Sequence, residues 1–384
     1  MDAMSTQRKR IFTTHTGSLP RPGTLTQPAQ DGDAGAAPLR STVAETVSAQ
    51  IKSGLDVIND GEMSKPSYVS YVTQRLAGFG GPPAPRRRRN VEDFPEYAAR
   101  QFGDPALARI LEPPSCDGPV SYLGHELLAR DIENLRVAVA DHPVVEVFMT
   151  AASPGVIEMF MPNHYYHRNE DYLLALADAM KEEYDAIAAA GFLVQLDCPD
   201  LAAGWENQPP GTTLAEFRRQ VATRLELIDY ATRDIPPERL RMHLCWGNYE
   251  GPHHHDLPLA NIIDLVLRAR PAALCLEAAN PRHEHEWAVF KDVPLPEGKV
   301  LIPGVLDTTT NYIEHPELVA QRITRFAEVV GRQRVIAGSD CGFATFAARP
   351  LIDPRIAWAK LATLAEGARL ASEMLWPSAK IEFP

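Results

Sequence analysis

Apolar runs alternate with amphipathic segments over most of the chain, which predicts repeated strand–loop–helix units. Short apolar runs such as FLVQLD and AALCLE are expected to be buried strands, because parallel strands covered on both faces read as continuous apolar runs. Between them, helical spacing recurs and is strongest over 171–190, with Gly191 as the expected helix stop. The pattern therefore favours an α/β fold with a parallel sheet.

The predicted elements can be placed along the chain. Strands are expected within 9–22, 55–64, 142–153, 192–200, 240–248, 272–280, 300–310 and 334–343. Helices are expected over 39–53, 171–190, 213–232, 261–270, 317–330 and 356–374. The segment 78–114 differs, since it holds GGPPAPRRRRN and shows no sustained period. We interpret it as a long loop or lid-like insertion within a single domain spanning 1–384.

Polar residues end every predicted strand, which distinguishes between two α/β architectures. A (β/α)₈ TIM barrel places its active site at the carboxyl ends of its strands, whereas a doubly wound sheet usually shows a glycine-rich phosphate loop. No G-x-G-x-x-G or P-loop motif follows any predicted strand. The barrel is therefore expected, with these residues at its mouth: His15, Ser18, Glu62, Asp197, His243, Cys245, Glu277, Asp307, Asp340 and Cys341.

Composition narrows the function classes. The 384 residues are 45% hydrophobic and carry a formal net charge of −12, which argues against a nucleic acid or an anionic membrane as the main partner. No run of 18 apolar residues and no signal peptide is recognisable. The five cysteines are odd in number and far apart, so we expect reduced thiols and a cytoplasmic protein.

Several strand-end residues suit a metal ion. His243 and Cys245 are two positions apart, so a strand would present both on one face. A barrel would bring Glu277 and Cys341, from later strand ends, to the same place. This donor set is coherent for Zn²⁺, and two thiolates disfavour Mg²⁺ or Ca²⁺. Cys275 remains an alternative to Glu277, because it lies two residues earlier on the same face.

Other conspicuous residues are interpreted as structural or solvent-facing. The histidine run 253–255 follows Gly-Pro and is expected to be a loop that faces solvent or substrate, because consecutive loop histidines point in different directions. His283 and His285 lie among charged residues and are expected on the surface. The arginine run 86–89 is interpreted as a solvated charge run.

A resemblance strengthens the zinc interpretation. The segments THTGSLPRP, NDGEMSK, QLDCPDLA, HLCWGN, LCLEAAN, IPGVLD and GSDCGF occur in the order found in the cobalamin-independent methionine synthase family. From about residue 11 to residue 374, the sequence resembles that family's C-terminal catalytic barrel. The resemblance implies a zinc ion held by His243, Cys245, Glu277 and Cys341 that binds the substrate thiol and lowers its pKa.

The resemblance also suggests roles for substrate-binding residues. It implies that Ser18 helps to hold the substrate carboxylate and that Glu62 and Asp197 hold the amino group of homocysteine. His15, from the same strand end as Ser18, is placed with this substrate-binding group.

The chain departs from the family at two positions. Thr309 stands about where the family has a histidine thought to act as an acid, and Phe160 is the nearest aromatic residue to the tryptophan that stacks on folate. We therefore consider Asp307 and His253 as candidate catalytic acids.

Three functions remain open at this stage. The first is a zinc-dependent methyl- or alkyltransferase that activates a small homocysteine-like thiol, with a folate or a corrinoid protein as donor. The second is the addition of a thiol to an epoxide, as in epoxyalkane:coenzyme M transferases. Coenzyme M carries a sulfonate, which the basic residues Arg21, Lys65 and 86–89 could favour. The third is a non-catalytic thiol-binding zinc protein. Uroporphyrinogen decarboxylases share the barrel but lack the zinc-ligand set. The sequence leaves a homo-oligomer open, and the expected partners are small molecules.

Overall fold

The computed structural model describes residues 9–21, 33–84, 86–103, 113–346 and 351–377. Eight parallel strands form a barrel. Going around the barrel, they follow one another in the order of the chain. These strands are β1 (Phe12–Thr13), β2 (Val57–Ile58), β5 (Glu146–Ala152), β6 (Leu193–Asp197), β7 (Leu240–Leu244), β8 (Ala273–Glu277), β9 (Val300–Leu306) and β10 (Ile336–Ser339). The predicted (β/α)₈ barrel is confirmed.

Strands β1 and β2 close the barrel without a regular ladder between them. Ladder pairing runs from β2 through β5 to β10 and on to β1. Across the remaining seam, Asp56 N donates to Thr13 O at 3.1 Å, and Thr14 Oγ1 donates to Val57 O at 3.0 Å. These two bonds satisfy backbone groups that an open sheet edge would leave bare.

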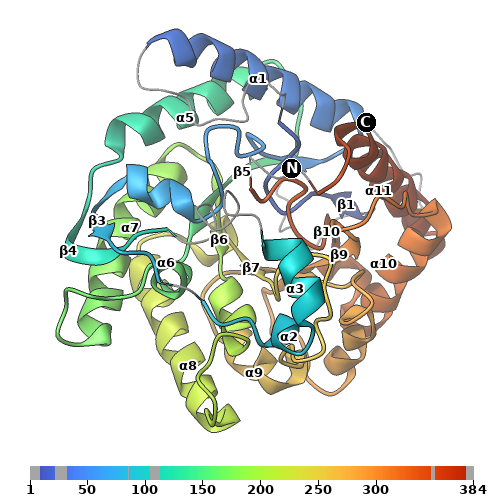
Figure 1. Ribbon diagram of the computed structural model, residues 1–384. Coiled ribbons are helices and arrows are strands. Elements are labelled where there is room, and N and C mark those ends of the chain that lie inside the picture. Colours follow the sequence, from blue (N-terminus) through green and yellow to red (C-terminus); the bar gives the residue numbers. More distant parts are fainter. Residues whose placement is uncertain (1–8, 22–32, 85, 104–112, 347–350, 378–384) are drawn as a thin grey trace.

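Helices surround the barrel, as Figure 1 shows. The long ones are α1 (Asp33–Lys52), α5 (His125–Val139), α7 (Asn169–Ala189), α8 (Leu214–Ala231), α10 (Pro316–Val330) and α11 (Pro354–Leu375). Five of these six match predicted helices, and α5 lies outside the predicted elements. None of the described helices combines the length and apolar character needed to cross a membrane.

Two helices show how local sequence sets their ends. Thr213 and Glu216 form a capping box before α8, in which Thr213 Oγ1 accepts from Glu216 N and Glu216 Oε2 accepts from Thr213 N. Gly191, two residues after α7, has a φ of 87°, a conformation that glycine adopts without steric cost. It therefore acts as the stop expected from the sequence.

The helix predicted over 261–270 is mostly absent. Only α9 (Ile263–Val266) is α-helical there, and a 3₁₀ helix, η6 (Leu259–Asn261), precedes it. Prolines at 258 and 271 bound the segment, and its β-branched residues have reduced helix propensity. After β8, the barrel likewise carries only the 3₁₀ helix η7 (Glu284–Lys291).

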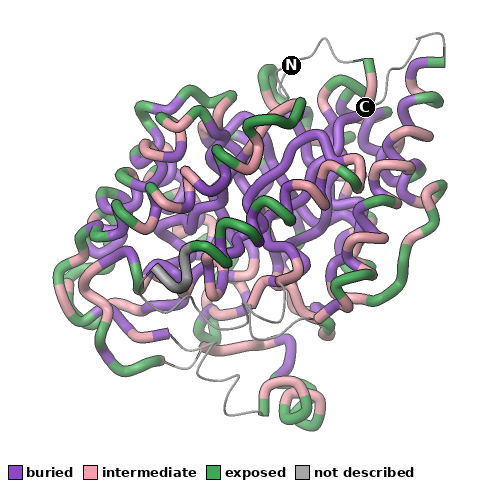
Figure 2. Tube along the Cα trace, turned by 90° about the horizontal axis from the view of Figure 1, so that it is seen from above, coloured by how far each residue is buried: buried purple, intermediate pink, exposed green. Residues whose placement is uncertain are grey.

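The insertion is not the structureless loop expected over 78–114. It begins with β3 (Leu76–Gly81) and ends with β4 (Ser115–Tyr122), and these two strands pair in an antiparallel sheet. Two short helices follow β3, namely α2 (Arg89–Glu92) and α3 (Pro95–Phe102). Figures 1 and 2 show α2 and α3 standing off one end of the barrel, across its mouth. The lid-like position was thus expected, but the regular structure was not.

Buried apolar residues fill the space between the strands and the helices. Figure 2 shows buried chain through the centre and exposed chain on the outer turns of the helices. Inside the barrel, a separate cluster contains Phe12, Ala273, Cys275, Val300, Ile302 and Ile336. Alternation along the strands produces this division, because successive side chains point into and out of the barrel.

A buried ion-pair cluster attaches the insertion to the helices. Arg75, directly before β3, lies 2.6 Å from Asp131 of α5 and 3.0 Å from Glu183 of α7. Tyr71 and Tyr122 also donate to the Glu183 carboxylate, at 2.8 and 2.9 Å. All of these groups are buried, so the arginine compensates two carboxylates that water does not reach.

Replacing this arginine should be costly. Arg75→Met leaves Glu183 without its ion-pair partner and Asp131 with only the partly exposed Arg130, and we expect the free energy of unfolding to fall by about 3–5 kcal/mol. Arg136→Met removes an exposed pair with Glu133 in the same helix and serves as the matched control. Guanidinium unfolding of the full chain measures both variants. Equal midpoints for the two variants would contradict the importance of the buried cluster.

Candidate metal-thiolate site

A cavity opens at the carboxyl ends of the barrel strands, where the polar strand ends were predicted to meet. Its walls come from strand ends on one side and from the insertion on the other. Six of the predicted site residues line it: Ser18, Glu62, Asp197, His243, Cys245 and Cys341. The barrel topology therefore gathers residues more than 300 positions apart into one site.

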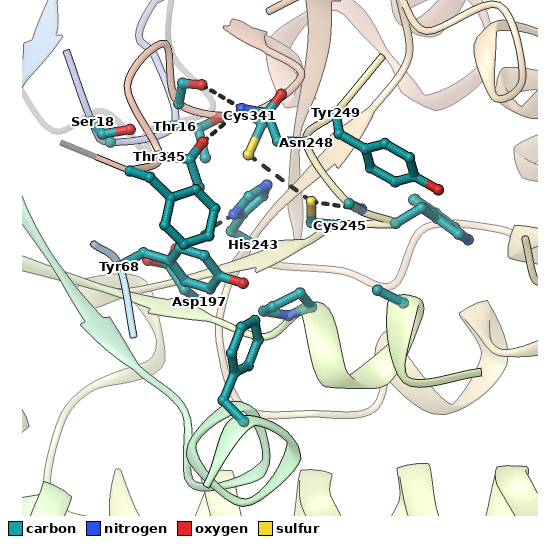
Figure 3. Close-up of a pocket in the computed structure, with 18 of the residues that line it drawn as sticks. Thr16, Ser18, Tyr68, Asp197, His243, Cys245, Asn248, Tyr249, Cys341 and Thr345 are labelled. Carbon is teal, nitrogen blue, oxygen red and sulfur yellow. Dashed lines mark hydrogen bonds and ion pairs between the residues drawn. The ribbon is translucent and has the colours of Figure 1, made fainter. Parts of the chain in front are cut away.

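Three of these residues form a compact cluster of metal-ligating atoms. His243 lies in β7, Cys245 follows that strand, and Cys341 follows β10. One ligand atom from each residue lies within 4.8 Å of the others, and the two Sγ atoms are 3.9 Å apart. Figure 3 shows the three side chains turned toward one another in the cavity. Both cysteines are free thiols.

The imidazole of His243 has one committed and one uncommitted nitrogen. Nδ1 faces Asp197 Oδ1 at 3.4 Å, an orientation visible in Figure 3. Nε2 is buried and has no hydrogen-bond partner among the described residues. Since buried polar atoms are nearly always satisfied, this nitrogen identifies a place for a further ligand.

The charges of the cluster are coupled. Hydrogen bonding from Cys245 lowers the pKa of Cys341 to about 6, against the effect of burial and with help from His243. The same contact with Cys341, together with burial, raises the pKa of Cys245. Burial alone would lower the pKa of His243, but Asp197 and Cys341 raise it above its ordinary value. Contacts within the cluster thus favour ionisation of Cys341 over that of Cys245.

Glu277 does not join the three-residue cluster. Its Oε1 accepts from Trp246 N at 2.8 Å, and its Oε2 accepts from Asn280 Nδ2 at 3.1 Å. It is buried at the end of β8, where the sequence placed it, but both carboxylate oxygens are already engaged. In this structure it orients the backbone that follows Cys245, and its role as a fourth zinc ligand stays a prediction. Cys275, the alternative, points into the barrel core.

A neighbouring carboxylate fixes the ends of three strands. Asp340 accepts from the backbone N–H groups of residues 278, 279 and 280 at 2.7–2.9 Å. It crosses over Gly304 of β9, where an added Cβ would lie 2.4 Å from Asp340 Cα and Oδ1. Only glycine permits this approach. Asp340 therefore sets the position of Cys341 relative to the end of β8.

Glu62 presents a second uncommitted polar atom to the cavity. Its Oε1 accepts from Thr150 Oγ1 at 3.0 Å, whereas Oε2 is buried without a partner among the described residues. Burial and the nearby Asp197 raise the pKa of Glu62 to about 7, although Lys65 opposes the rise. The backbone of Glu62 has a φ of 58°, an uncommon conformation for a residue with a side chain. Such strain is typical of functional sites.

Three predicted residues lie away from the cavity lining. His15 is buried inside the barrel, bonded through Nε2 to Gln50 at 2.8 Å, and burial lowers its pKa to about 3. Asp307 accepts from Thr309 and Thr310, so its carboxylate caps a turn. His253 uses both ring nitrogens, one toward Asp256 at 2.7 Å and one toward Tyr249 O at 3.1 Å. These three residues are thus outside the cavity lining, and the substrate contact of His15 and the acid role of Asp307 or His253 stay predictions.

A buried network behind the cluster was missed by sequence reasoning. Asp256 contacts both His253 and His283, and His283 also bonds to Glu286 at 2.8 Å. The ring of His283 stacks on Trp246 with centroids 4.1 Å apart. His283 is therefore buried, contrary to the expected surface position, whereas His285 is exposed as expected. The i,i+3 spacing of His283 and Glu286 was the available signal.

The arginine run is also not simply solvated. Arg86 and Arg88 line the cavity, with their guanidinium groups over the rings of Phe160 and Phe102 at 3.6 and 4.2 Å. Arg87 follows the expectation more closely, since it pairs with Glu92 on the surface. The cavity wall opposite the strand ends is thus aromatic and positively charged.

Comparison with known proteins assigns the chain to a family. Residues 149–354 match the family described as "Cobalamin-independent synthase, Catalytic domain". The chain belongs to the cobalamin-independent methionine synthase family. The resemblance inferred from the strand-end motifs is confirmed, and the chain is a methionine synthase-like methyltransferase.

Curated relatives and solved structures agree with this membership. The methionine synthase of Thermococcus kodakarensis is 24% identical over 334 residues, which are 87% of this chain and 83% of the relative. That of Saccharolobus solfataricus is 24% identical, covering 94% of this chain and 95% of the relative.

Among solved structures, a B12-independent methionine synthase from Shewanella sp. W3-18-1, in complex with selenomethionine, superposes with a TM-score of 0.71. It is 18% identical and covers 96% of this chain and 99% of its own. A putative vitamin-B12 independent methionine synthase from Listeria monocytogenes gives 0.66, also at 18% identity, covering 94% and 98%. At these identities the likeness shows the barrel fold. The epoxide and non-catalytic alternatives are not favoured.

Proposed function

We propose that this chain is a zinc-dependent methyltransferase that methylates the sulfur of a homocysteine-like amino thiol. One observation carries the proposal. The Cys245–Cys341 pair and the unpartnered Nε2 of His243 open on the same cavity as the unpartnered Oε2 of Glu62. The cavity thereby combines a cluster that can hold a thiol-binding metal with a carboxylate that can bind a cationic group.

The three-residue cluster fits zinc. Zinc–sulfur bonds of about 2.3 Å in a tetrahedron require a sulfur–sulfur distance of about 3.8 Å. The observed 3.9 Å meets this requirement without rearrangement. Three protein ligands and one open position are typical of catalytic zinc sites. When bound by His243, Cys245 and Cys341, the ion would lower the pKa of a substrate thiol placed in that open position.

Glu62 and Asp197 suit the amino group of the substrate. An ammonium group would supply the donor that Glu62 Oε2 lacks, and charge-assisted hydrogen bonds are the stronger kind. A sulfonate has no such donor. Two of the cations that could favour a sulfonate are also committed elsewhere. Arg21 donates to the carbonyls of Glu62, Lys65 and Ala344, and Lys65 Nζ donates to Thr150.

The insertion is proposed to complete the methyl-donor side, so that barrel and insertion act as one catalytic domain. Phe160 and Phe102, each covered by a guanidinium, suit a flat donor with negative charge. In the transfer, a lone pair on the deprotonated substrate sulfur attacks the methyl carbon. The new sulfur–carbon bond forms as the bond between carbon and the donor atom breaks, and its electron pair leaves with the donor.

Loss of a cysteine ligand should remove the metal. In Cys341→Ser, a hard hydroxyl replaces a thiolate, and we expect zinc content to fall from about one ion per chain to nearly none. Thiol transfer should be lost with it. Elemental analysis of the purified chain measures the metal. A variant that keeps full zinc and full rate would show that the cluster is not the zinc site.

Glu277→Gln separates a ligand from an orienting group. The amide oxygen can still accept from Trp246 N, so we expect this variant to keep about one zinc per chain, unlike Cys341→Ser. The rate should fall less than about tenfold, because only an orienting contact is weakened. Zinc loss equal to that of Cys341→Ser would make Glu277 a ligand, as the sequence first suggested.

Glu62 should control the affinity for the amino group. We expect Glu62→Gln to weaken homocysteine binding to the zinc protein about tenfold or more, through loss of a charge-assisted contact. Deaminohomocysteine, which lacks the amino group, is the matched control and should change little. In the wild type, affinity for homocysteine should rise with pH through about 7 as Glu62 ionises.

Calorimetry with both thiols isolates that effect. Release of the thiol proton is common to the two ligands, so the difference between their pH profiles belongs to the amino group. X-ray absorption then reports sulfur coordination for homocysteine, coenzyme M, glutathione and cysteine. Coordination by coenzyme M alone would overturn the amino-thiol assignment. No sulfur ligand from any thiol would overturn the proposed function.

A further inference from the structure

Two of the histidines in the run 253–255 meet a carboxylate from the insertion. Asp93, directly after α2, lies with Oδ2 2.9 Å from His254 Nε2 and 2.7 Å from His255 Nε2. The two rings are adjacent, with centroids 4.0 Å apart. One ligand atom from each of the three residues lies within 4.8 Å of the others. Consecutive histidines therefore converge here, although loop histidines usually diverge.

Buried contacts on both sides hold this convergence in place. Asn90, in α2 and three residues before Asp93, accepts from His255 N at 2.7 Å and donates to Asp256 Oδ1 at 2.7 Å. Its own N–H donates to Glu206. Asn90 is fully buried, so α2 is docked on the loop after β7 in one register. The cluster is thus built on fixed backbone rather than on two free surface chains.

We propose that Asp93, His254 and His255 form a second metal site, which binds a divalent transition-metal ion such as Zn²⁺ and clamps α2 to the loop after β7. Two imidazoles and one carboxylate suit zinc and its neighbours in the first transition series. Bonds of about 2.0 Å in a tetrahedron need ligand atoms about 3.3 Å apart, so the observed contacts would open by about 0.5 Å.

The exposure of the site sets its character. The two histidine side chains are 34% exposed and the Asp93 side chain 55%, so water can fill the remaining coordination positions. The site has no thiolate, and it is expected to bind zinc more weakly and to exchange it faster than the buried cysteine cluster.

A clamp at this place would act on the cavity wall. Arg88 directly precedes α2, and Phe102 ends α3, and both line the cavity. A metal ion that ties α2 to the barrel would therefore hold this wall over the cavity. The role is one of positioning, because none of the three ligands lines the cavity.

Cobalt titration of the full, tag-free and metal-free chain tests the proposal. We expect two Co²⁺ ions per chain, the tighter one with sulfur-to-metal charge-transfer absorption and the weaker one without it. Asp93→Asn and the double variant His254→Gln/His255→Gln should bind one ion, with the charge-transfer band unchanged. His285→Gln, an exposed histidine outside the cluster, is the matched control and should bind two.

Hydrogen exchange tests the clamp itself. In the wild type, exchange in α2 and α3 should slow when the second equivalent of Co²⁺ is added, and it should not respond in Asp93→Asn. A single ion per wild-type chain, or two ions in Asp93→Asn, would overturn the second site. Two ions with unchanged exchange in α2 and α3 would overturn the clamp. These readouts do not depend on methyl transfer, so they stand apart from the proposed function.

Discussion

The carboxylate of Asp340 is the constraint on which the arrangement of the site depends. It receives three consecutive backbone N–H groups from the segment after β8, and it reaches them by crossing over Gly304 in β9. Three strands are thereby held at one height. Cys341, the next residue, can then face Cys245, which follows β7, with the two Sγ atoms 3.9 Å apart. The two sulfurs come from the ends of β7 and β10, which do not pair with each other in the sheet.

Two buried polar atoms in the cavity lining lack hydrogen-bond partners within the described part of the chain, which lowers the stability of the folded protein. His243 Nε2 and Glu62 Oε2 are buried without partners among the described residues, and each such atom costs about 1–3 kcal/mol. Other buried atoms of the described residues also lack partners, for example His15 Nδ1 and Arg241 Nε, but these two residues do not line the cavity. His243 Nε2 and Glu62 Oε2, by contrast, belong to residues that line the cavity, where a ligand can satisfy them. A bound ligand would supply the missing hydrogen bonds and so recover this free energy. In an exposed site, water would already make these hydrogen bonds, and binding would gain less.

The sequence predicted features that follow from the alternation of side chains along a strand. It missed features that depend on contacts between segments far apart in the chain. His243 and Cys245 could be paired because residues two apart on a strand share a face, and the barrel followed from polar residues at each strand end. Arg86 and Arg88 could not be separated from a solvated run, since their aromatic partners lie in another segment. Glu277 shows the limit of this spacing rule, which places a carboxylate near the site but cannot tell that Trp246 N and the Asn280 side chain donate to it.

The loop after β7 connects the two ends of the cavity. It begins at Cys245 in the thiolate cluster and reaches the insertion at His254 and His255. Near its start, Trp246 stacks on His283, and near its end Asp256 contacts both His253 and His283, so buried contacts hold both ends of the loop. The insertion and the sulfur cluster thus contact the same loop.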